Sequence, residues 1–269
     1  MKQLIVITCT YERPLRQRYV LRLIDVFKKI PDLLWIIVED DSTCSREINE
    51  LLCASGIKYK YLAVGPTKDK GNAQKNLAIN YIRENKLKGI VYIADDDNVY
   101  TKKLFQELRK VKRVAIFPVG NKGPSRIERP IIKDREIVGW DAAWLERKFP
   151  VDMGGFAFSS EAIMDLEDQV WFWNIAGGET EFLEKFVKSK DELELLCDMC
   201  KECYVWHNQP LDLDYRLTKF EIKYIDPLVR SLSGRMSVCS KFLELIRRGL
   251  RKSNRTWSNF KEGVKKDDK

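Results

Sequence analysis

The fold is decided by the stretch Val91-Tyr92-Ile93-Ala94-Asp95-Asp96-Asp97-Asn98, in which an apolar run ends abruptly in three carboxylates and an amide. β-Branched and aromatic residues favour a buried strand, whereas three adjacent aspartates cannot be buried without partners. We therefore expect a central strand whose carboxyl end opens into a cleft that holds a divalent cation, at the sheet edge where nucleotide-type ligands bind. The alternative is an acidic turn that caps a helix over residues 98–103, because Asp and Asn are frequent in turns and at helix starts.

Strand and helix patterns alternate through the first half of the chain. Helical periodicity marks residues 13–29 and 72–84, and short apolar runs predict strands at 3–8, 33–38, 58–64 and 89–94. This alternation predicts an α/β fold with a mostly parallel central sheet and helices on both faces. Because two of the strands end in acidic clusters, polar groups are expected to gather at the carboxyl edge of the sheet, as a nucleotide crevice requires.

The second half of the chain has a different pattern, with more aromatic residues and longer loops. Strands are expected at residues 114–119, 137–144 and 151–158, a polar loop at 120–129, and helices from Glu179 and over 238–249. We predict one domain over residues 1–215, made of a nucleotide-binding half (1–100) and an acceptor-binding half (101–215). A helical and basic extension is predicted at 216–269.

Composition narrows the class of protein. The net charge of +8 over 269 residues suits anionic ligands such as phosphates, and would also suit nucleic acid or an anionic membrane surface. No run of about 18 apolar residues is present, so no membrane-spanning helix is predicted. The first apolar run has the length of a strand and is too short for a secretory signal. We therefore expect a soluble, unanchored protein, and place it in the cytoplasm.

The seven cysteines are an odd number, which argues against a complete disulfide framework. Cys197, Cys200 and Cys203 have C-x-x-C-x-x-C spacing. A metal site there would need a fourth ligand, for which His207 is the nearest candidate, whereas the helical spacing favours a packed face. Cys53 sits in an apolar context and is expected to be a small core residue.

Two further groups of residues carry the chemistry of charged ligands. Lys70 and Lys75 flank a Gly71-Asn72 turn that enters a helix, so they either meet phosphate oxygens or form an ordinary solvated helix start. Glu179 follows two glycines, which let the backbone approach a ligand closely. It could act as a general base, or it could be one of several first-turn acids that favour the helix dipole, and the residues alone do not separate it from Glu181.

Four motifs occur in an order and spacing that resemble a known family. They are Val38-Glu39-Asp40, Tyr92-Ile93-Ala94-Asp95-Asp96-Asp97-Asn98, Phe149-Pro150-Val151-Asp152-Met153-Gly154-Gly155-Phe156-Ala157 and Val205-Trp206-His207. In these motifs the chain is similar to the β-1,3-glucuronosyltransferases that complete the glycosaminoglycan–protein linkage region. They belong to glycosyltransferase family 43, which also includes plant xylan-synthesis proteins. The resemblance runs over residues 5–207.

The resemblance implies a glycosyltransferase-A fold, a UDP-sugar donor, Mn²⁺ (with Mg²⁺ as the alternative) and inversion at the anomeric carbon. It implies transfer of a glucuronosyl residue from UDP-glucuronic acid to a galactoside-type glycan acceptor. Family members usually sit in the Golgi membrane, so the Golgi lumen is the alternative compartment if the chain is a fragment. Family members often pair as dimers, which makes a homodimer an option here, and no nucleic-acid partner is expected.

The same resemblance implies roles for single residues. Asp97 matches the carboxylate that binds the metal, and Glu179 matches the catalytic base. The donor-binding positions, which meet uracil, ribose, diphosphate or sugar, are Tyr11, Asp40, Lys70, Lys75, Asp95, Asp96 and His207. The positions that line the acceptor and sugar region are Glu128, Trp140, Arg147 and Asp152. Trp144 is another tryptophan whose flat face could stack on a sugar ring, although core packing is the default for any tryptophan.

The chain departs from the family pattern at three positions. Lys70 and Lys75 stand where the family carries arginines, and lysine keeps the charge but loses the planar fork. Ile175 stands where glucuronosyltransferases carry the arginine that helps recognise the donor carboxylate. The donor could therefore be UDP-glucuronic acid held by other cations, or a neutral sugar such as UDP-xylose. Two rival hypotheses are a nucleotidyltransferase and a non-catalytic protein that binds glycan or nucleic acid.

Overall fold

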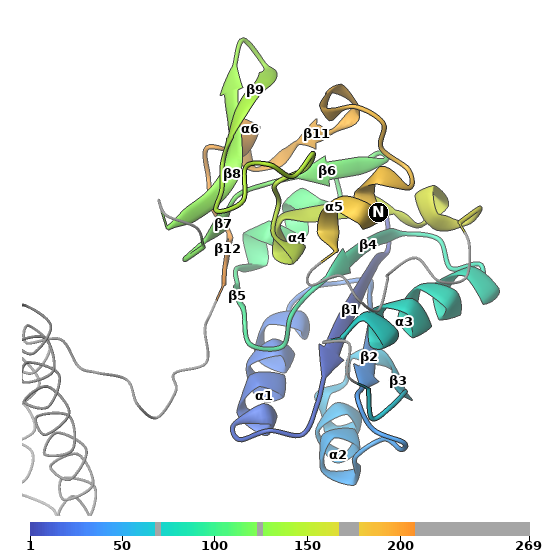
Figure 1. The fold of residues 1–269 in the computed structure, drawn as a ribbon. Helices are drawn as coiled ribbons and strands as arrows, with labels where there is room; N and C mark the ends of the chain where they lie inside the picture. Colours follow the sequence, from blue (N-terminus) through green and yellow to red (C-terminus); the bar gives the residue numbers. More distant parts are fainter. Residues whose placement is uncertain (68–70, 123–125, 167–177, 208–269) are drawn as a thin grey trace, which may run out of the picture. The chain divides into compact units, whose positions relative to one another are not determined.

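The computed structural model describes residues 1–67, 71–122, 126–166 and 178–207 (Figure 1). These residues belong to one structural unit. The predicted extension at 216–269, its helix at 238–249 and the domain boundary at residue 215 lie outside the described residues. None of the described helices combines the length and the apolar character that crossing a membrane would require.

Within the described residues, seven strands form a central sheet in the order β11-β6-β10-β4-β1-β2-β3 (Figure 1). Their bounds are β1 Leu4–Thr10, β2 Leu33–Glu39, β3 Lys58–Ala63, β4 Ile90–Ile93, β6 Val114–Ile116, β10 Phe156–Ser159 and β11 Glu194–Leu195. Among these seven, only β10 runs antiparallel to its neighbours, β4 and β6. The prediction of a mostly parallel sheet is confirmed.

Helices cover both faces of this sheet, as predicted. Successive strand residues point to opposite faces, so Val6, Trp35 and Tyr92 pack on one side, while Ile7 and Ile36 pack on the other. The first side is covered by α1 (Arg16–Phe27), α2 (Arg46–Ser55) and α4 (Lys102–Leu108). The second side is covered by α3 (Asn72–Glu84) and α5 (Glu179–Glu184). Burial on both faces explains why the central strands read as unbroken apolar runs.

A second sheet brings the end of the described chain back to the acidic triplet. Its strands, in the order β5-β12-β7-β8-β9, are β5 Val99–Tyr100, β12 Val205–Trp206, β7 Val119–Gly120, β8 Ile127–Lys133 and β9 Glu136–Asp141. Strand β12 lies between β5 and β7, and the backbone N–H of His207 donates to the carbonyl oxygen of Gly120 at 2.9 Å. The pairing of β12 with β5 therefore places His207 close to the residues that follow β4.

Several predicted bounds are corrected by the structure. The single strand expected at 114–119 is two strands, β6 and β7, in different sheets, and Pro118 between them has no N–H for a ladder. The loop expected at 120–129 overlaps the start of β8. The strand expected at 151–158 begins with a 3₁₀ turn, η1 (Met153–Gly155), and becomes a strand only at Phe156. The unpredicted helix α2 is capped by Ser45, whose side chain accepts from the Ile48 N–H at 3.4 Å.

The interpretation of the acidic triplet as a helix cap is wrong. The following helix, α4, begins at Lys102 and is capped by Thr101, whose hydroxyl accepts from the Leu104 N–H at 3.4 Å. Strand β5 separates this cap from Asp97. The three aspartates are therefore not explained by helix capping, and their crowding needs another physical reason.

The described cysteines differ in their burial. Cys197 and Cys200 are buried in α6 (Leu196–Cys200), and the described cysteines are free thiols. Within the described ranges, no three His, Cys, Asp or Glu side chains are placed to hold a metal by themselves. Burial of Cys197 and Cys200 agrees with the predicted packing, but Cys203 is only partly buried and residues 197–200 of α6 have left-handed backbone angles, so the expected helical face is not formed. The prediction for Cys53 is wrong, because that residue is exposed.

Candidate active site

The carboxyl ends of three parallel strands meet at one edge of the central sheet. In the register of β1 and β2, Thr10 lies opposite Glu39, and the next residues along each strand direction are Tyr11 and Asp40. Strand β4, on the other side of β1, ends at Ile93 just before the acidic triplet. Parallel pairing therefore brings together the groups that were predicted at this edge.

The acidic triplet is held in place by named partners. Asp96 is buried and accepts hydrogen bonds from the Thr10 hydroxyl, at 2.8 Å, and from the guanidinium of Arg13. Asp97 Oδ2 lies 3.6 Å from the same guanidinium. Asp95 Oδ2 accepts from Asn98 Nδ2 at 3.3 Å. Arg13 thus faces two of the three carboxylates, a role that no local pattern in the sequence marks.

The region around Asp95 has an excess of negative charge. Burial and the nearby carboxylates of Asp152 and Asp97 raise the pKa of Asp95 to about 7, although Lys75 opposes the rise. Carboxylate oxygens are the ligands that Mn²⁺ and Mg²⁺ prefer, and a divalent cation would relieve this crowding. The donor set therefore fits such an ion, provided that a bound molecule supplies the remaining ligands, because the described side chains alone do not complete a site.

Tyr11 and Asp40, the residues predicted to meet the nucleotide base, directly follow β1 and β2. The Tyr11 side chain is 46% exposed, and the Arg13 guanidinium lies over its ring, 4.4 Å from the centroid. Asp40 Oδ1 accepts from the Thr67 N–H at 2.6 Å. A Cβ atom added to Gly65 would clash with this carboxylate, so the close approach requires glycine there. Asp40 is therefore held by a backbone group, with its position fixed before any ligand arrives.

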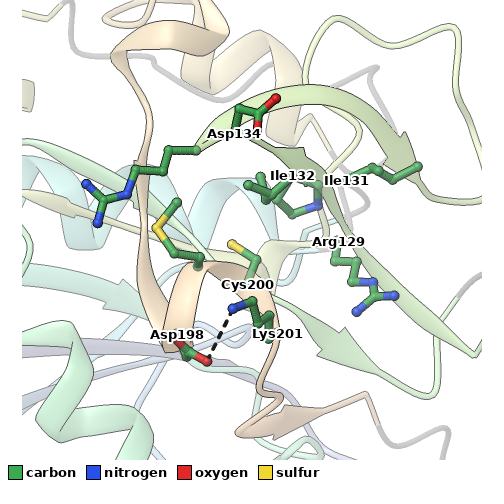
Figure 2. A pocket seen from close by; sticks show the side chains of 10 residues that line it. Arg129, Ile131, Ile132, Asp134, Asp198, Cys200 and Lys201 are labelled. Atoms are coloured by element: carbon green, nitrogen blue, oxygen red, sulfur yellow. Dashed lines mark ion pairs between the residues drawn. The ribbon is translucent and has the colours of Figure 1, made fainter.

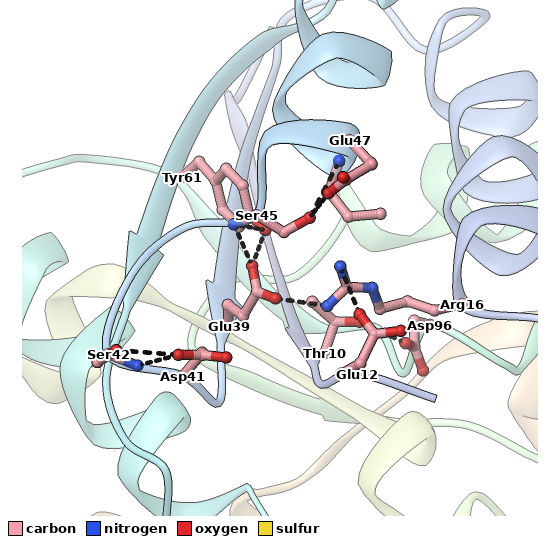
Figure 3. A network of polar contacts seen from close by, with 11 residues as sticks. Thr10, Glu12, Arg16, Glu39, Asp41, Ser42, Ser45, Glu47, Tyr61 and Asp96 are labelled. Carbon is pink, nitrogen blue, oxygen red and sulfur yellow. Dashed lines mark hydrogen bonds and ion pairs between the residues drawn. The ribbon is translucent and has the colours of Figure 1, made fainter. Parts of the chain in front are cut away.

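A network of polar contacts surrounds the buried residues Glu39 and Arg16 (Figure 3). The carboxylate of Glu39 accepts from Arg16 and from the Tyr61 hydroxyl, and its Oε2 accepts from the Ser45 N–H at 2.8 Å. Arg16 also pairs with Glu12 at 3.0 Å. Glu39 and Arg16 are both almost fully buried. Because Glu39 immediately precedes Asp40, the network fixes the direction in which the chain leaves β2.

Glu179 is the first residue of α5, the short helix that packs on the second side of the sheet. Its N-cap is Gly178, with φ 78°, a left-handed conformation that favours glycine. The Thr180 hydroxyl donates to the Phe149 carbonyl at 2.8 Å and ties the helix start to the Phe-Pro-Val-Asp-Met motif. Burial raises the pKa of Glu179, Asp152 raises it further, and Lys75 and Arg147 oppose the rise. Lys75 is buried, and its positive charge opposes the rise in pKa of both Glu179 and Asp95.

The predicted acceptor-side acids are paired with two cations. Arg147 Nη2 lies 3.2 Å from Glu128 Oε1, and Arg147 Nη1 lies 3.6 Å from Glu179 Oε2. Asp152 Oδ1 accepts from the Gly154 N–H at 3.0 Å, while Asp152 Oδ2 lies 3.1 Å from Lys122 Nζ. The structure therefore groups all three predicted acceptor-side charges with Glu179, and adds Lys122, which was not predicted.

His207 lies near the same carboxylates. Burial and the positive charge of Lys122 lower its pKa, while Asp152 and Asp97 act in the opposite direction. Its Nδ1 atom is buried and has no hydrogen-bond partner among the described residues. A buried ring nitrogen without a partner is costly in a finished structure. This atom is therefore suited to a hydrogen bond with a bound ligand.

The two tryptophans near the site differ in their surroundings. Trp140 lies in β9 opposite Pro130, is half-buried and packs against the core. Trp144 is 60% exposed, and the Arg147 guanidinium lies 5.5 Å from its ring centroid. Trp144 thus presents an open aromatic face next to the Arg147–Glu179 pair, whereas Trp140 has the contacts of a packing residue.

A hollow of about 550 Å³ lies between the β8–β9 hairpin and α6, with Arg129, Asp134 and Lys201 among its lining residues (Figure 2). None of the predicted site residues lines it. The hollow is therefore distinct from the group of residues around Asp97 and Glu179. Two other positions that were singled out from the sequence, Lys70 and Ile175, lie outside the described residues.

Solved structures with a similar fold support the architecture. The crystal structure of S. aureus TarS 1-349 gives a TM-score of 0.51 at 14% identity, over 77% of this chain and 61% of that one. The same protein in complex with UDP-GlcNAc gives 0.51 at 11% identity, over 84% of this chain and 65% of that one. At this identity the likeness concerns the fold alone, which is the predicted glycosyltransferase-A type.

Sequence comparison identifies the family. The model of glycosyltransferase family 43 matches residues 23–210, a range that includes all four motifs. "Galactosylgalactosylxylosylprotein 3-beta-glucuronosyltransferase 2" of Rattus norvegicus is 33% identical, over 76% of this chain and 67% of the rat protein. "Probable beta-1,4-xylosyltransferase IRX9L" of Oryza sativa subsp. japonica is 36% identical, over 77% of this chain and 51% of the rice protein. The chain therefore belongs to glycosyltransferase family 43 and is a glycosyltransferase.

Proposed function

We propose that this protein transfers a glucuronosyl residue from UDP-glucuronic acid to a galactoside-type glycan, with inversion at the anomeric carbon. One observation carries the proposal: the segment from Phe149 to Gly154 contacts both α5 and the end of the acidic triplet. The Thr180 hydroxyl donates to the Phe149 carbonyl at 2.8 Å, and a Cβ atom added to Gly154 would lie 3.5 Å from Asn98 Nδ2. A donor bound between α5 and the triplet would have its leaving group near the triplet and its sugar near Glu179. The rat relative's name, which specifies a 3-beta-glucuronosyltransferase, supports the choice of sugar.

On the donor side, the chain's own residues provide binding for each part of the nucleotide. Tyr11 offers an exposed ring to the base, and Asp40 is held ready to pair with it. Asp95 and Asp96 would meet ribose and sugar hydroxyls, and Lys75 and His207 would meet the diphosphate. Asp97 would hold Mn²⁺ or Mg²⁺. When bound, such an ion neutralises the charge that develops on the departing diphosphate.

On the acceptor side, Glu179 is proposed as the general base. It would take the proton from the acceptor hydroxyl as that oxygen attacks the anomeric carbon, on the face opposite the leaving UDP. Burial makes its carboxylate more basic than an ordinary glutamate. Arg147 would keep the carboxylate turned toward the acceptor, because it is itself fixed by Glu128 and by the Val151 carbonyl at 3.3 Å.

The acceptor sugar would lie against Trp144. Its ring is exposed and lies beside Arg147, within the same group of residues as the base. Flat apolar faces of sugars stack on aromatic rings, while Glu128 and Asp152 offer carboxylates to sugar hydroxyls. This arrangement supports a glycan acceptor.

A second candidate donor is UDP-xylose. Ile175 stands where the family carries an arginine for the donor carboxylate, and the rice relative is named a xylosyltransferase. The two candidates share the fold, the base and the leaving group, so they differ only in what the site offers to carbon 6 of the sugar. A direct comparison of the two donors separates them.

The test is a donor screen in which free UDP is measured after incubation with UDP-sugars, Mn²⁺ and a β-galactoside acceptor. We expect UDP-glucuronic acid to give the highest acceptor-dependent release. Highest release from UDP-xylose would replace the donor while keeping the mechanism. Absence of release from every UDP-sugar, with UDP binding intact, would contradict the proposed activity.

A further inference from the structure

Lys122, which the sequence did not mark as a site residue, places a positive charge within the candidate site. It follows strand β7, after Asn121, whose φ of 58° turns the chain. Its Nζ lies 3.1 Å from Asp152 Oδ2, and its side chain is 33% exposed. The lysine is thus held by one carboxylate and remains accessible to a ligand.

The surroundings of Lys122 are those of the reaction centre. Burial lowers its pKa, but the carboxylates of Asp152, Glu128 and Glu179 outweigh this effect and raise the pKa above its ordinary value. Its charge also acts on His207, on the donor side of the site. Two residues before Lys122, the Gly120 carbonyl accepts from the His207 N–H at 2.9 Å. The ammonium group therefore lies close to a residue proposed for the diphosphate, and Asp152, which holds it, belongs to the segment that contacts the start of α5.

The neighbouring arginines are already engaged with carboxylates. Arg147 pairs with Glu128 and lies 3.6 Å from Glu179, and Arg13 pairs with Asp96 and lies 3.6 Å from Asp97. Lys122 has a single ion-pair partner within the described residues, Asp152. An ammonium group has three N–H donors, so one can stay with Asp152 while the others meet a second anion.

The second oxygen of Asp152 makes this arrangement stable. Its Oδ1 accepts from the Gly154 N–H at 3.0 Å, which fixes the carboxylate at the start of η1. Because the Asp152 carboxylate is itself fixed, it holds the Lys122 ammonium group in one position. A lysine positioned in this way by a fixed carboxylate can bind a carboxylate on a sugar without a large loss of side-chain entropy.

We propose that Lys122 is the specificity-determining cation of this enzyme: its ammonium group binds the carboxylate at carbon 6 of the donor sugar while it stays paired with Asp152. This inference rests on the proposed function, because only a uronic acid donor carries that carboxylate. Lys122 would then supply the positive charge for the sugar carboxylate that is missing at Ile175, where the family carries an arginine. A neutral sugar such as xylose gains nothing from this charge, so Lys122 would separate the two candidate donors.

The test is calorimetric titration of the full chain with UDP, UDP-glucuronic acid and UDP-xylose in the presence of Mn²⁺. In the unsubstituted protein we expect UDP-glucuronic acid to bind more tightly than UDP-xylose. In Lys122→Met this ratio of affinities should fall about tenfold or more, because a hydrogen bond to a charged group contributes on that order. Any change in the affinity for UDP itself should be smaller than the change in this ratio, and Lys122→Arg should keep most of the preference.

Lys28→Met is the matched control, because Lys28 pairs with Asp25 at the surface near the end of α1 and lies outside the site. It should leave all three affinities unchanged. Equal affinity ratios in Lys122→Met and the unsubstituted protein, with UDP binding intact in both, would overturn the role of Lys122 and leave the proposed function standing. Failure of the unsubstituted protein to bind UDP with Mn²⁺ would overturn the proposed function, and this inference with it.

Discussion

Arg147 Nη1 lies 3.6 Å from Glu179 Oε2. The same guanidinium lies 3.2 Å from Glu128 and donates to the Val151 carbonyl at 3.3 Å, so its position does not depend on Glu179. A fixed cation beside a buried carboxylate both orients it and favours its ionised form. Arg147 is therefore a positioning residue for the proposed base.

The first prediction concerns the pH dependence of transfer. A base must be ionised, and burial raises the pKa of Glu179, so activity should fall on acidification at a higher pH than for an ordinary glutamate. In Arg147→Met the pKa should rise further, and the acid limb of kcat/KM should move to higher pH. Arg113→Met, which removes an arginine paired with Glu192 at the surface, is the control. An acid limb at the same pH in both variants would rule out the role given to Arg147.

The second prediction concerns Glu179 itself. Glu179→Gln keeps the size of the side chain but removes its capacity to accept a proton, so transfer should fall about 10²–10⁴-fold. UDP affinity in the presence of Mn²⁺ should stay within a factor of about two, since other residues are proposed to contact the donor phosphates. Glu184→Gln, in the same helix but paired with Lys148 at the surface, should retain activity. Undiminished transfer by Glu179→Gln would assign the base to another residue.

The third prediction concerns the network behind Asp40. Arg16 and Glu39 are both about 4% exposed or less, and removal of one partner leaves the other buried and unpaired. Arg16→Met should therefore lower the free energy of unfolding by about 3 kcal/mol. Arg46→Met, which breaks an exposed pair with Glu50, should have little effect. Denaturant unfolding measures the free energy of unfolding of both variants. Equally small decreases in the two variants would show that the buried pair contributes no more to stability than the exposed pair.

The fourth prediction concerns the acceptor. Trp144→Ala removes an exposed ring and little core packing, so it should raise the KM for the glycan acceptor about tenfold and leave the KM for the donor unchanged. Trp140→Ala should instead lower the melting temperature, because that side chain packs against the core. A change in the acceptor KM with Trp140→Ala and none with Trp144→Ala would favour Trp140, the residue expected from the sequence, over Trp144.

Periodicity predicted the elements whose faces are strongly patterned. The bounds of α3, Asn72–Glu84, agree with the prediction, because its buried apolar residues Ala78, Ile79 and Ile82 recur at helical spacing, although residues 72–76 are all buried. Helix α2 went unpredicted, since only Ile48 and Leu52 within it are buried. The strand expected at 114–119 was divided by a change of sheet, which depends on long-range pairing that a local pattern does not carry.

The sequence predicted the site residues that lie at the ends of neighbouring strands. It did not predict the contacts that form between segments far apart in the chain. Parallel pairing brings Asp40 and Asp97 to one edge of the sheet. Acidic residues at the ends of predicted parallel strands were therefore enough to predict that these two side chains lie at the same edge. The pair between Lys122 and Asp152 joins residues far apart in sequence, and no local pattern marks it. The choice between Trp140 and Trp144 depends on where β9 ends, at Asp141, because Trp144 lies beyond the strand and is exposed.

Asp97 is proposed to hold a divalent cation which a donor's diphosphate also binds, and every step of the proposed transfer depends on this. The most direct measurement is calorimetric titration of UDP into the protein with and without Mn²⁺, repeated on Asp97→Ala. We expect Mn²⁺ to tighten UDP binding about tenfold or more in the unsubstituted protein and to have no effect in the variant. Equal UDP affinity with and without Mn²⁺ in the unsubstituted protein would contradict the proposed mechanism.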